Sequence, residues 1–116
     1  MQHKYQVNLT YQLNISDDTL RYELQADLYR VVFEAVTSVV LKDSGRNFKV
    51  VLQIFKNKIW LNIYDDCQGF SHFDSKINFD ISMYYIRQIA KKHNGSINTF
   101  KEQDDGSQLV LSLPLP

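Results

Sequence analysis

Two adjacent carboxylates, a cysteine and a glycine stand together in the stretch YDDCQGF, residues 64–70. The stretch directly follows a run of alternating apolar residues, at the point where a strand is expected to end. Ionised carboxylates there could accept hydrogen bonds from a ligand, and a cysteine thiolate is a nucleophile. The same residue types also make an ordinary polar turn. Residue type and position therefore leave a turn and the floor of a binding site both open.

A second group of polar residues, Glu34, Ser38 and Lys42, recurs every four positions within an apolar stretch. On a helix this spacing places the three side chains on a common face. Such a line can serve a functional site, or it can be the solvated flank that most amphipathic helices carry. The spacing alone favours the solvated flank.

Composition excludes several classes of protein. Lysine plus arginine number 13 and aspartate plus glutamate number 13, so the basic surplus of a nucleic-acid binder is missing. No apolar run approaches the roughly 20 residues of a membrane span, and the N-terminus lacks an apolar signal core. We therefore expect a cytoplasmic protein without membrane contact. One cysteine and three scattered histidines, His3, His72 and His93, predict neither a disulfide nor a zinc site.

The elements that position these residues follow from changes in hydrophobic period. The 116 residues suit one domain, residues 1–116. Residues 5–15 alternate strictly, which predicts a strand with one face in solvent. A helical stripe predicts a largely enclosed helix over about 23–42. Strands are expected at 47–55 and 58–64, with a tight connection at Lys56 and Asn57.

The second half of the chain predicts a loop, a helix and a hairpin. Residues 67–80 have no steady period and form the expected loop. Asp80 then caps a helix that Gly95 ends as a left-handed residue. Its inward residues are expected to be Ile81, Ile86, Ile89, Ala90 and His93. Two closing strands with a turn at DDGS complete an α+β fold, an α/β sandwich whose helices cover one face of a mostly antiparallel sheet.

Four stretches with this order and spacing resemble the ATP-binding catalytic domain of sensor histidine kinases. They are LYRVVFEAVTSVV (28–40), YDDCQGF (64–70), IRQIAKKHNGSI (86–97) and DGSQLVLSLPL (105–115). The chain is most similar to the nitrate- and lipid-sensor subgroup of this Bergerat-fold family, and the resemblance covers nearly the whole sequence. It implies a mixed five-stranded sheet, ATP or ADP with Mg²⁺ as ligand, and a lid-like loop at about 67–80.

The resemblance also implies roles for residues on the long helix and at the strand exit. Glu34 matches the candidate general base, close to the metal. Ser38 stands where the family has a magnesium-binding asparagine, and a neutral hydroxyl is a poorer ligand for this hard cation. Asp65 matches the aspartate that accepts a hydrogen bond from the adenine amino group. Asp66 is expected to be simply exposed.

The glycine motifs of the family are only partly present. Gly69 matches the second glycine of its D-x-G-x-G motif, whereas Cys67 replaces the first and adds bulk near the nucleotide. Asp80 and Ser82 replace the glycines whose backbone cradles the phosphates. Gly106 and Ser107 match the G-G-T turn. The Ser107 hydroxyl is expected either to join the hydrogen-bond network around adenine or to serve only the turn.

Two functions of different classes follow. The first is the histidine-kinase-type ATPase domain of a two-component signalling protein, with weakened magnesium and phosphate sites. Its partners would be a phosphoacceptor histidine domain and a response regulator, and a homodimer is left open. No histidine here lies in a phosphoacceptor-like motif, so whether the chain alone is an enzyme stays open. An anti-sigma-type serine kinase is disfavoured by LYRVVFEA.

The second function is a nucleotide-free, pseudokinase-like interaction module that keeps the sandwich and regulates a signalling protein. Tyrosines are enriched at protein interfaces, so they could supply its contact surface. The same side chains could equally belong to the core. The tyrosines concerned are Tyr22, Tyr29, Tyr84 and Tyr85.

Overall fold

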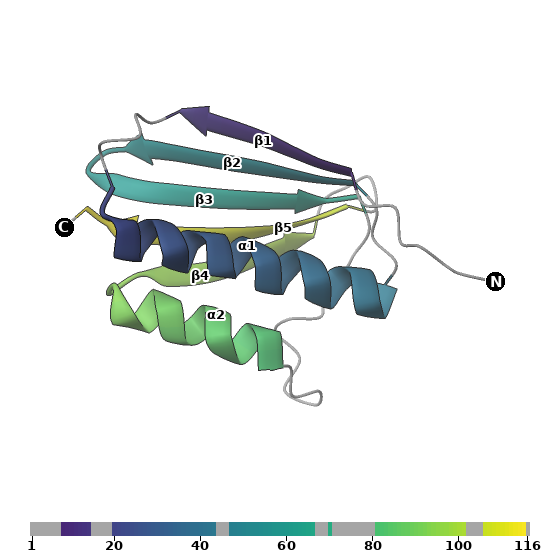
Figure 1. Ribbon diagram of the computed structural model, residues 1–116. Coiled ribbons are helices and arrows are strands. Elements are labelled where there is room, and N and C mark those ends of the chain that lie inside the picture. The colour runs from purple at the N-terminus through teal and green to yellow at the C-terminus, as the bar shows by residue number, and fades with distance from the viewer. Residues whose placement is uncertain are drawn as a thin grey trace.

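The computed structural model describes residues 8–14, 20–43, 47–66, 70, 81–101 and 106–115. Five strands form one mixed sheet in the order β1-β2-β3-β5-β4, and both helices lie on one face of it (Figure 1). The expected α+β sandwich is confirmed. The elements are β1 (Asn8–Asn14), α1 (Tyr22–Asp43), β2 (Asn47–Phe55), β3 (Lys58–Asp65), α2 (Ile81–Lys92), β4 (Ser96–Lys101) and β5 (Ser107–Pro114).

The β2–β3 hairpin forms where the sequence predicts it. Its two connecting residues, Lys56 and Asn57, have φ angles of 54° and 62°. Positive φ at both central positions is the geometry of a type I′ turn, whose twist matches that of the flanking strands. The resulting register pairs Phe55 with Lys58 and carries Asp65 to the far end of β3, opposite Phe48.

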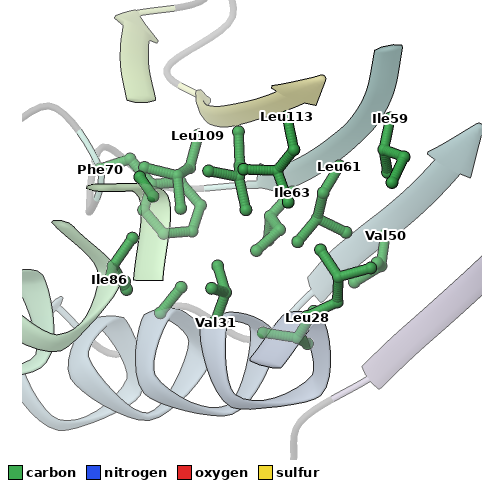
Figure 2. Packing of buried hydrophobic residues seen from close by; sticks show 14 of the residues in the cluster. Leu28, Val31, Val50, Ile59, Leu61, Ile63, Phe70, Ile86, Leu109 and Leu113 are labelled. Carbon is green, nitrogen blue, oxygen red and sulfur yellow. The ribbon is translucent and has the colours of Figure 1, made fainter. Parts of the chain in front are cut away.

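The core lies between the helices and the inner face of the central strands. On α1 the predicted stripe is buried, and its members face residues of β2, β3 and β5 (Figure 2). The spacing of three and four positions keeps these side chains on one side of the helix. The stripe consists of Leu28, Val31, Val32, Ala35 and Val39, and the strand residues include Val50, Leu61, Ile63, Leu109 and Leu111.

One expected face of β1 is not buried. Every residue of this strand is exposed, including Leu9 at 37%, Tyr11 at 52% and Leu13 at 59%. The physical reason is position, because β1 is an edge strand, parallel to β2, and lies away from the helices (Figure 1). Tyr11 and Leu13 instead line an apolar hollow of about 260 Å³ together with Leu28 and Tyr29 of α1.

The inward face of α2 differs from the expected one at its first residue. Ile81 is 56% exposed, whereas Ser82, Met83, Ile86 and Ala90 are buried. Five positions separate Ile81 from Ile86, which at 3.6 residues per turn turns it about 140° away from the buried face. The expectation that Ile81 points inward was therefore wrong.

Asn94, not Gly95, is the left-handed residue after α2. Asn94 has φ 57°, and its N–H donates to the Lys91 carbonyl over 3.1 Å. The Gly95 N–H donates to the Ala90 carbonyl over 2.8 Å, which completes a Schellman-type C-cap. A glycine is needed at position 95 for a different reason. A Cβ atom there would overlap the Leu113 side chain and the Ser112 carbonyl oxygen of β5.

A polar cluster joins the start of α1 to the end of α2. The Lys92 ammonium lies 2.7 Å from Glu23 and 3.1 Å from Asp27, and His93 Nε2 lies 2.7 Å from Asp27 Oδ2. Burial alone would raise the pKa of Asp27, but hydrogen bonds from His93 and Lys92 together hold this pKa below its usual range. The cluster therefore stabilises the ionised carboxylate.

Asp27→Asn should flatten the acid limb of the stability profile. A carboxyl group whose folded-state pKa is lowered stabilises the fold above its unfolded pKa, and this contribution is lost as pH falls through the folded value. Wild-type free energy of unfolding should therefore drop below about pH 4, and the variant should lose up to about 1 kcal/mol near neutrality. Urea unfolding between pH 7 and pH 3 measures both quantities. Glu23→Gln, at a side chain that is 72% exposed, should change the profile less.

Candidate functional site

Asp65 and Ser107 form a buried polar pair at the end of the sheet where β3 ends and β5 begins. Asp65 is the last residue of β3 and lies directly opposite Ser107 in the β3–β5 register. The Ser107 hydroxyl donates to Asp65 Oδ2 over 3.3 Å. Asp65 is 5% exposed and Ser107 is fully buried. Burying a carboxylate is costly unless it is hydrogen-bonded, and the serine hydroxyl meets part of that need.

Phe70 extends this pair to the segment that follows β3. Its backbone N–H donates to Ser107 Oγ over 3.0 Å, while its ring is fully buried in the core beside Leu109 and Ile86 (Figure 2). The ring thus fixes the amide, the amide fixes the hydroxyl, and the hydroxyl orients Asp65. Sequence reasoning did not single out Phe70. An aromatic residue at the end of the polar stretch YDDCQGF was the available signal.

The chemistry of this network suits a ligand that donates hydrogen bonds. An ionised carboxylate is an acceptor only, and its two oxygens offer about four acceptor sites. Ser107 uses one of these sites on Oδ2. Asp65 can therefore accept a hydrogen bond from an amino group, such as that of adenine, without losing its contact with Ser107. Residues 65 and 107 thus fit the group that the sequence resemblance implies.

Asp66 is exposed, as expected, and is also part of a hydrogen-bonded clamp. The Asn47 side-chain amide donates to Asp66 Oδ2 over 2.6 Å, and the Asp66 N–H donates to the Asn47 carbonyl over 3.2 Å. The Asn8 amide in turn donates to Asn47 Oδ1 over 2.8 Å. These bonds tie the first residues of β1 and β2 to the exit of β3. They hold the backbone next to Asp65.

Glu34 is paired within its own helix. Its Oε1 atom lies 2.8 Å from Arg30 Nε, and the Glu34 side chain is 13% exposed. The Arg30 guanidinium also lies 4.9 Å from the centre of the Tyr85 ring on α2, a cation–π contact. For Glu34 to act as a base or as a metal ligand, the proton or the metal ion would have to compete with Arg30 for its carboxylate. The i, i+4 spacing of Arg30 and Glu34 was visible in the sequence.

The described residues offer little to a magnesium ion. Ser38, one turn after Glu34, is 4% exposed, and Ser82 in the first turn of α2 is 8% exposed. Both present neutral hydroxyls, whereas Mg²⁺ favours carboxylates and phosphate oxygens. Within the ranges that the structure describes, no group of three or more histidine, cysteine, aspartate or glutamate residues could hold a metal ion. The donor set fits an adenine amino group better than a metal.

Several predicted site residues lie outside the described residues. They include Cys67, Gly69 and Asp80, together with the rest of the 67–80 segment apart from Phe70. Their expected roles stay predictions. Gly106 is described and buried, directly before Ser107 at the start of β5.

All four tyrosines considered for a contact surface are on the outside of the molecule. Their exposed fractions are 89% for Tyr22, 67% for Tyr29, 47% for Tyr84 and 41% for Tyr85. They are therefore surface residues and not core. Among the described segments, no helix has the length and apolar character needed to cross a membrane.

Comparison with known proteins agrees with the sequence resemblance. The oxygen sensor histidine kinase NreB of Staphylococcus carnosus is 24% identical over 111 residues, which make up 96% of this chain and 32% of NreB. No protein-family model matches. The chain thus spans about a third of the length of this curated relative.

Two solved structures show the same architecture. The histidine kinase domain of the Erythrobacter litoralis EL346 blue-light activated histidine kinase superposes with a TM-score of 0.72 at 14% identity, covering 97% of this chain and 53% of that one. The ATP binding domain of PrrB from Mycobacterium tuberculosis gives 0.71 at 21% identity, covering 94% and 82%. The chain therefore has the fold of histidine kinase ATP-binding catalytic domains.

Proposed function

We propose that this chain is a histidine-kinase-type nucleotide-binding domain of a two-component signalling protein, which holds ATP or ADP through Asp65. The observation that carries the proposal is the buried Asp65–Ser107 pair, joined by a 3.3 Å hydrogen bond. The pair lies in a fold that solved histidine kinase domains share. The sequence similarity to NreB supports the same conclusion.

Asp65 would select the base of the nucleotide. An ionised carboxylate accepts a hydrogen bond from the 6-amino group of adenine but repels the 6-carbonyl oxygen of guanine. The Ser107 hydroxyl, held by the Phe70 amide, keeps the carboxylate in one orientation. A pre-organised network discriminates well between adenine and guanine, because a mismatched base would leave a buried polar group without its partner.

The phosphate and metal sites are proposed to be weak. Mg²⁺, when bound, would neutralise charge on the phosphates, and Ser38 and Glu34 are the residues near which the resemblance places it. Glu34 is held by Arg30 at 2.8 Å, and Asp80 and Ser82 occupy the positions of phosphate-cradling glycines. Since phosphoryl transfer depends on positioning and charge stabilisation, these substitutions should make transfer slow.

The partners of such a domain would be a phosphoacceptor histidine domain and a response regulator. In that assembly Glu34 would orient the attacking histidine once it has released Arg30.

A second function is favoured by the Arg30–Glu34 pair together with Ser38 at the metal position. It is a nucleotide-free interaction module that uses the exposed tyrosines of α1 and α2, and a nucleotide titration separates the two.

Thermal unfolding with ADP or ATP, with and without Mg²⁺, tests the proposed function. Nucleotide at 100 times its dissociation constant should stabilise the chain by about 2.7 kcal/mol and raise Tm on the order of 10 °C. We expect this rise to depend little on Mg²⁺ and to be absent with GTP. The double variant Ser38→Asn, Cys67→Gly should gain a Mg²⁺-dependent increment. A Tm that ignores millimolar adenine nucleotide would rule out nucleotide binding and favour the interaction module.

A further inference from the structure

Within the part of the chain that the structure describes, the outer edge of β1 lacks the features that normally prevent strands from pairing with other molecules. Proteins protect sheet edges with charged residues, proline, bulges or covering segments. The strand NLTYQLN, residues 8–14, contains no charged residue, no proline and no glycine. All its residues are exposed, and its pairing with β2 runs through all seven positions without a bulge. In Figure 1 it forms the rim of the sheet.

The sequence of this strand is nearly the same in both directions. Asparagine stands at both ends, leucine one position inside each end, and Tyr11 at the centre. Only Thr10 and Gln12 differ, and both are polar and uncharged. We propose that β1 pairs antiparallel with β1 of a second copy of this chain about a two-fold axis at Tyr11, which joins two five-stranded sheets into one.

This register matches like with like along the whole strand. Tyr11 lies opposite Tyr11 of the second copy, and Leu9 lies opposite Leu13, so apolar side chains meet on one face. Asn8 opposite Asn14 and Thr10 opposite Gln12 place polar side chains together on the other face. A shift of one residue would set each leucine against a polar residue. A shift of two residues would keep apolar residues opposite apolar ones, but only the register centred on Tyr11 pairs all seven positions, so the pattern favours this alignment.

Backbone hydrogen bonding is compatible with the same register. In a strand paired on one side, alternate residues direct their N–H and C=O groups to the open edge. Pairing centred on residue 11 matches odd positions with odd positions and even with even. Whichever set faces outward, its groups therefore meet an equivalent set. A register centred between two residues would not have this property.

A two-fold axis normal to the sheet keeps all helices on one side of the joined sheet. The Leu9, Tyr11 and Leu13 side chains of the two copies would then form one apolar row. This row continues the hollow that Tyr11 and Leu13 line with Tyr29 of α1, whose side chain is 67% exposed. The formal net charge of the chain is zero, so no long-range repulsion opposes association.

The association should be weak, because a strand of seven residues buries little area. Interfaces smaller than standard size bind weakly, so we expect a dissociation constant of roughly 10 µM to 1 mM for the isolated chain. Sedimentation velocity over this concentration range should show a monomer–dimer equilibrium. A wild-type chain that remains monomeric at about 1 mM overturns the proposal.

Disulfide cross-linking tests the register, in a Cys67→Ser background that removes the natural cysteine. Tyr11→Cys should form a dimer under mild oxidation, because opposed Cα atoms lie about 4.5–5.5 Å apart, within disulfide reach. Thr10→Cys alone should not, since its own copies would be about 8 Å apart. An equimolar mixture of Thr10→Cys and Gln12→Cys should link the two variants. If Thr10→Cys alone formed as much disulfide-linked dimer as Tyr11→Cys, this register would be overturned.

Charge substitutions at Leu9 and Leu13 give a test that does not depend on oxidation. Lysine at both positions should abolish self-association, because each lysine would oppose another, and glutamate at both should do the same. Mixing the two double variants should restore a dimer of one copy of each. Circular dichroism confirms that each variant is folded. Folded variants that stay apart when mixed, while the wild type dimerises, would contradict the Leu9–Leu13 pairing.

Discussion

Asp65→Asn should remove at least about half of the stabilisation that ADP at 100 times its wild-type dissociation constant produces, while the free chain stays folded. The asparagine keeps a carbonyl oxygen that can accept from Ser107, so the buried network retains its 3.3 Å contact. It loses the negative charge, and its amide places donors where the adenine amino group also donates. Hydrogen bonds to a charged group contribute about 1.5–3 kcal/mol, so affinity should fall roughly 10- to 150-fold. Calorimetric titration of ADP measures the loss directly.

Asp66→Asn is the matched control for this experiment. It makes the same chemical change at the neighbouring residue, which is exposed and bonded to Asn47. Nucleotide affinity should stay within about twofold of the wild type, because exposed polar contacts of this kind contribute little. Equal losses at both positions would mean that general charge near the β3 exit attracts the nucleotide. An unchanged affinity for Asp65→Asn would show that Asp65 does not contact the base.

Gly95→Ala should be among the most destabilising single substitutions on the surface of the fold. The added methyl group would overlap the Ser112 carbonyl oxygen and the Leu113 side chain. A side chain can rotate away, but a backbone oxygen in the middle of β5 cannot move without disturbing the ladder to β3 and β4. Overpacking of this kind costs about 1–3 kcal/mol. Urea unfolding should show a lower midpoint with an unchanged slope.

The neighbouring residue provides the comparison. Asn94→Gly places the residue with the greatest conformational freedom at φ 57° and should leave stability within about 0.5 kcal/mol of the wild type. The two variants thus separate a requirement for space from a requirement for left-handed backbone. If Gly95→Ala were neutral and Asn94→Gly stabilising by about 1 kcal/mol, the close approach of α2 to β5 would be wrongly described.

The central elements were predictable because their sequences contain local and consistent signals. The stripe on α1 shows a spacing that only a helix brings to one face, and its burial from Leu28 to Val39 followed. The two-residue connection at Lys56 and Asn57 predicted a hairpin, which the positive φ angles confirm. In both cases a short stretch of chain contains all the information required.

Two of the three errors concern a segment, distant in sequence, that covers an element or packs against it. Alternation in residues 8–14 shows which side chains share a face of β1, but not whether any helix lies over that face. Gly95 looked like a left-handed residue because glycine is common there, whereas its need for space comes from β5. The exposure of Ile81 is a local effect, because helical geometry turns it about 140° away from Ile86. Long-range contacts decide the first two outcomes, and helical periodicity decides the third.

The contacts of the candidate site also fall into those that local sequence could predict and those that depend on tertiary packing. Asp65 and Ser107 are 42 positions apart, and only the family resemblance suggested that they meet. The buried ring of Phe70 and its amide contact with Ser107 depend on tertiary packing and were missed. By contrast, the Arg30–Glu34 pair needed only helical spacing and was available from the sequence. This pair argues against a role for Glu34 as a base in the chain alone.

The attachment of β1 also affects how the chain gains and loses its structure. β1 is bonded to the sheet through β2 alone, in parallel, and the whole of α1 separates the two strands along the chain. Loop-closure entropy makes such pairings slow to form, and exposed strands are the first to open locally. Amide hydrogens of β1 should therefore exchange with solvent before those of β3. When β1 opens, β2 becomes the edge of the sheet. The exposed edge strand would then have a larger share of apolar residues than β1 has.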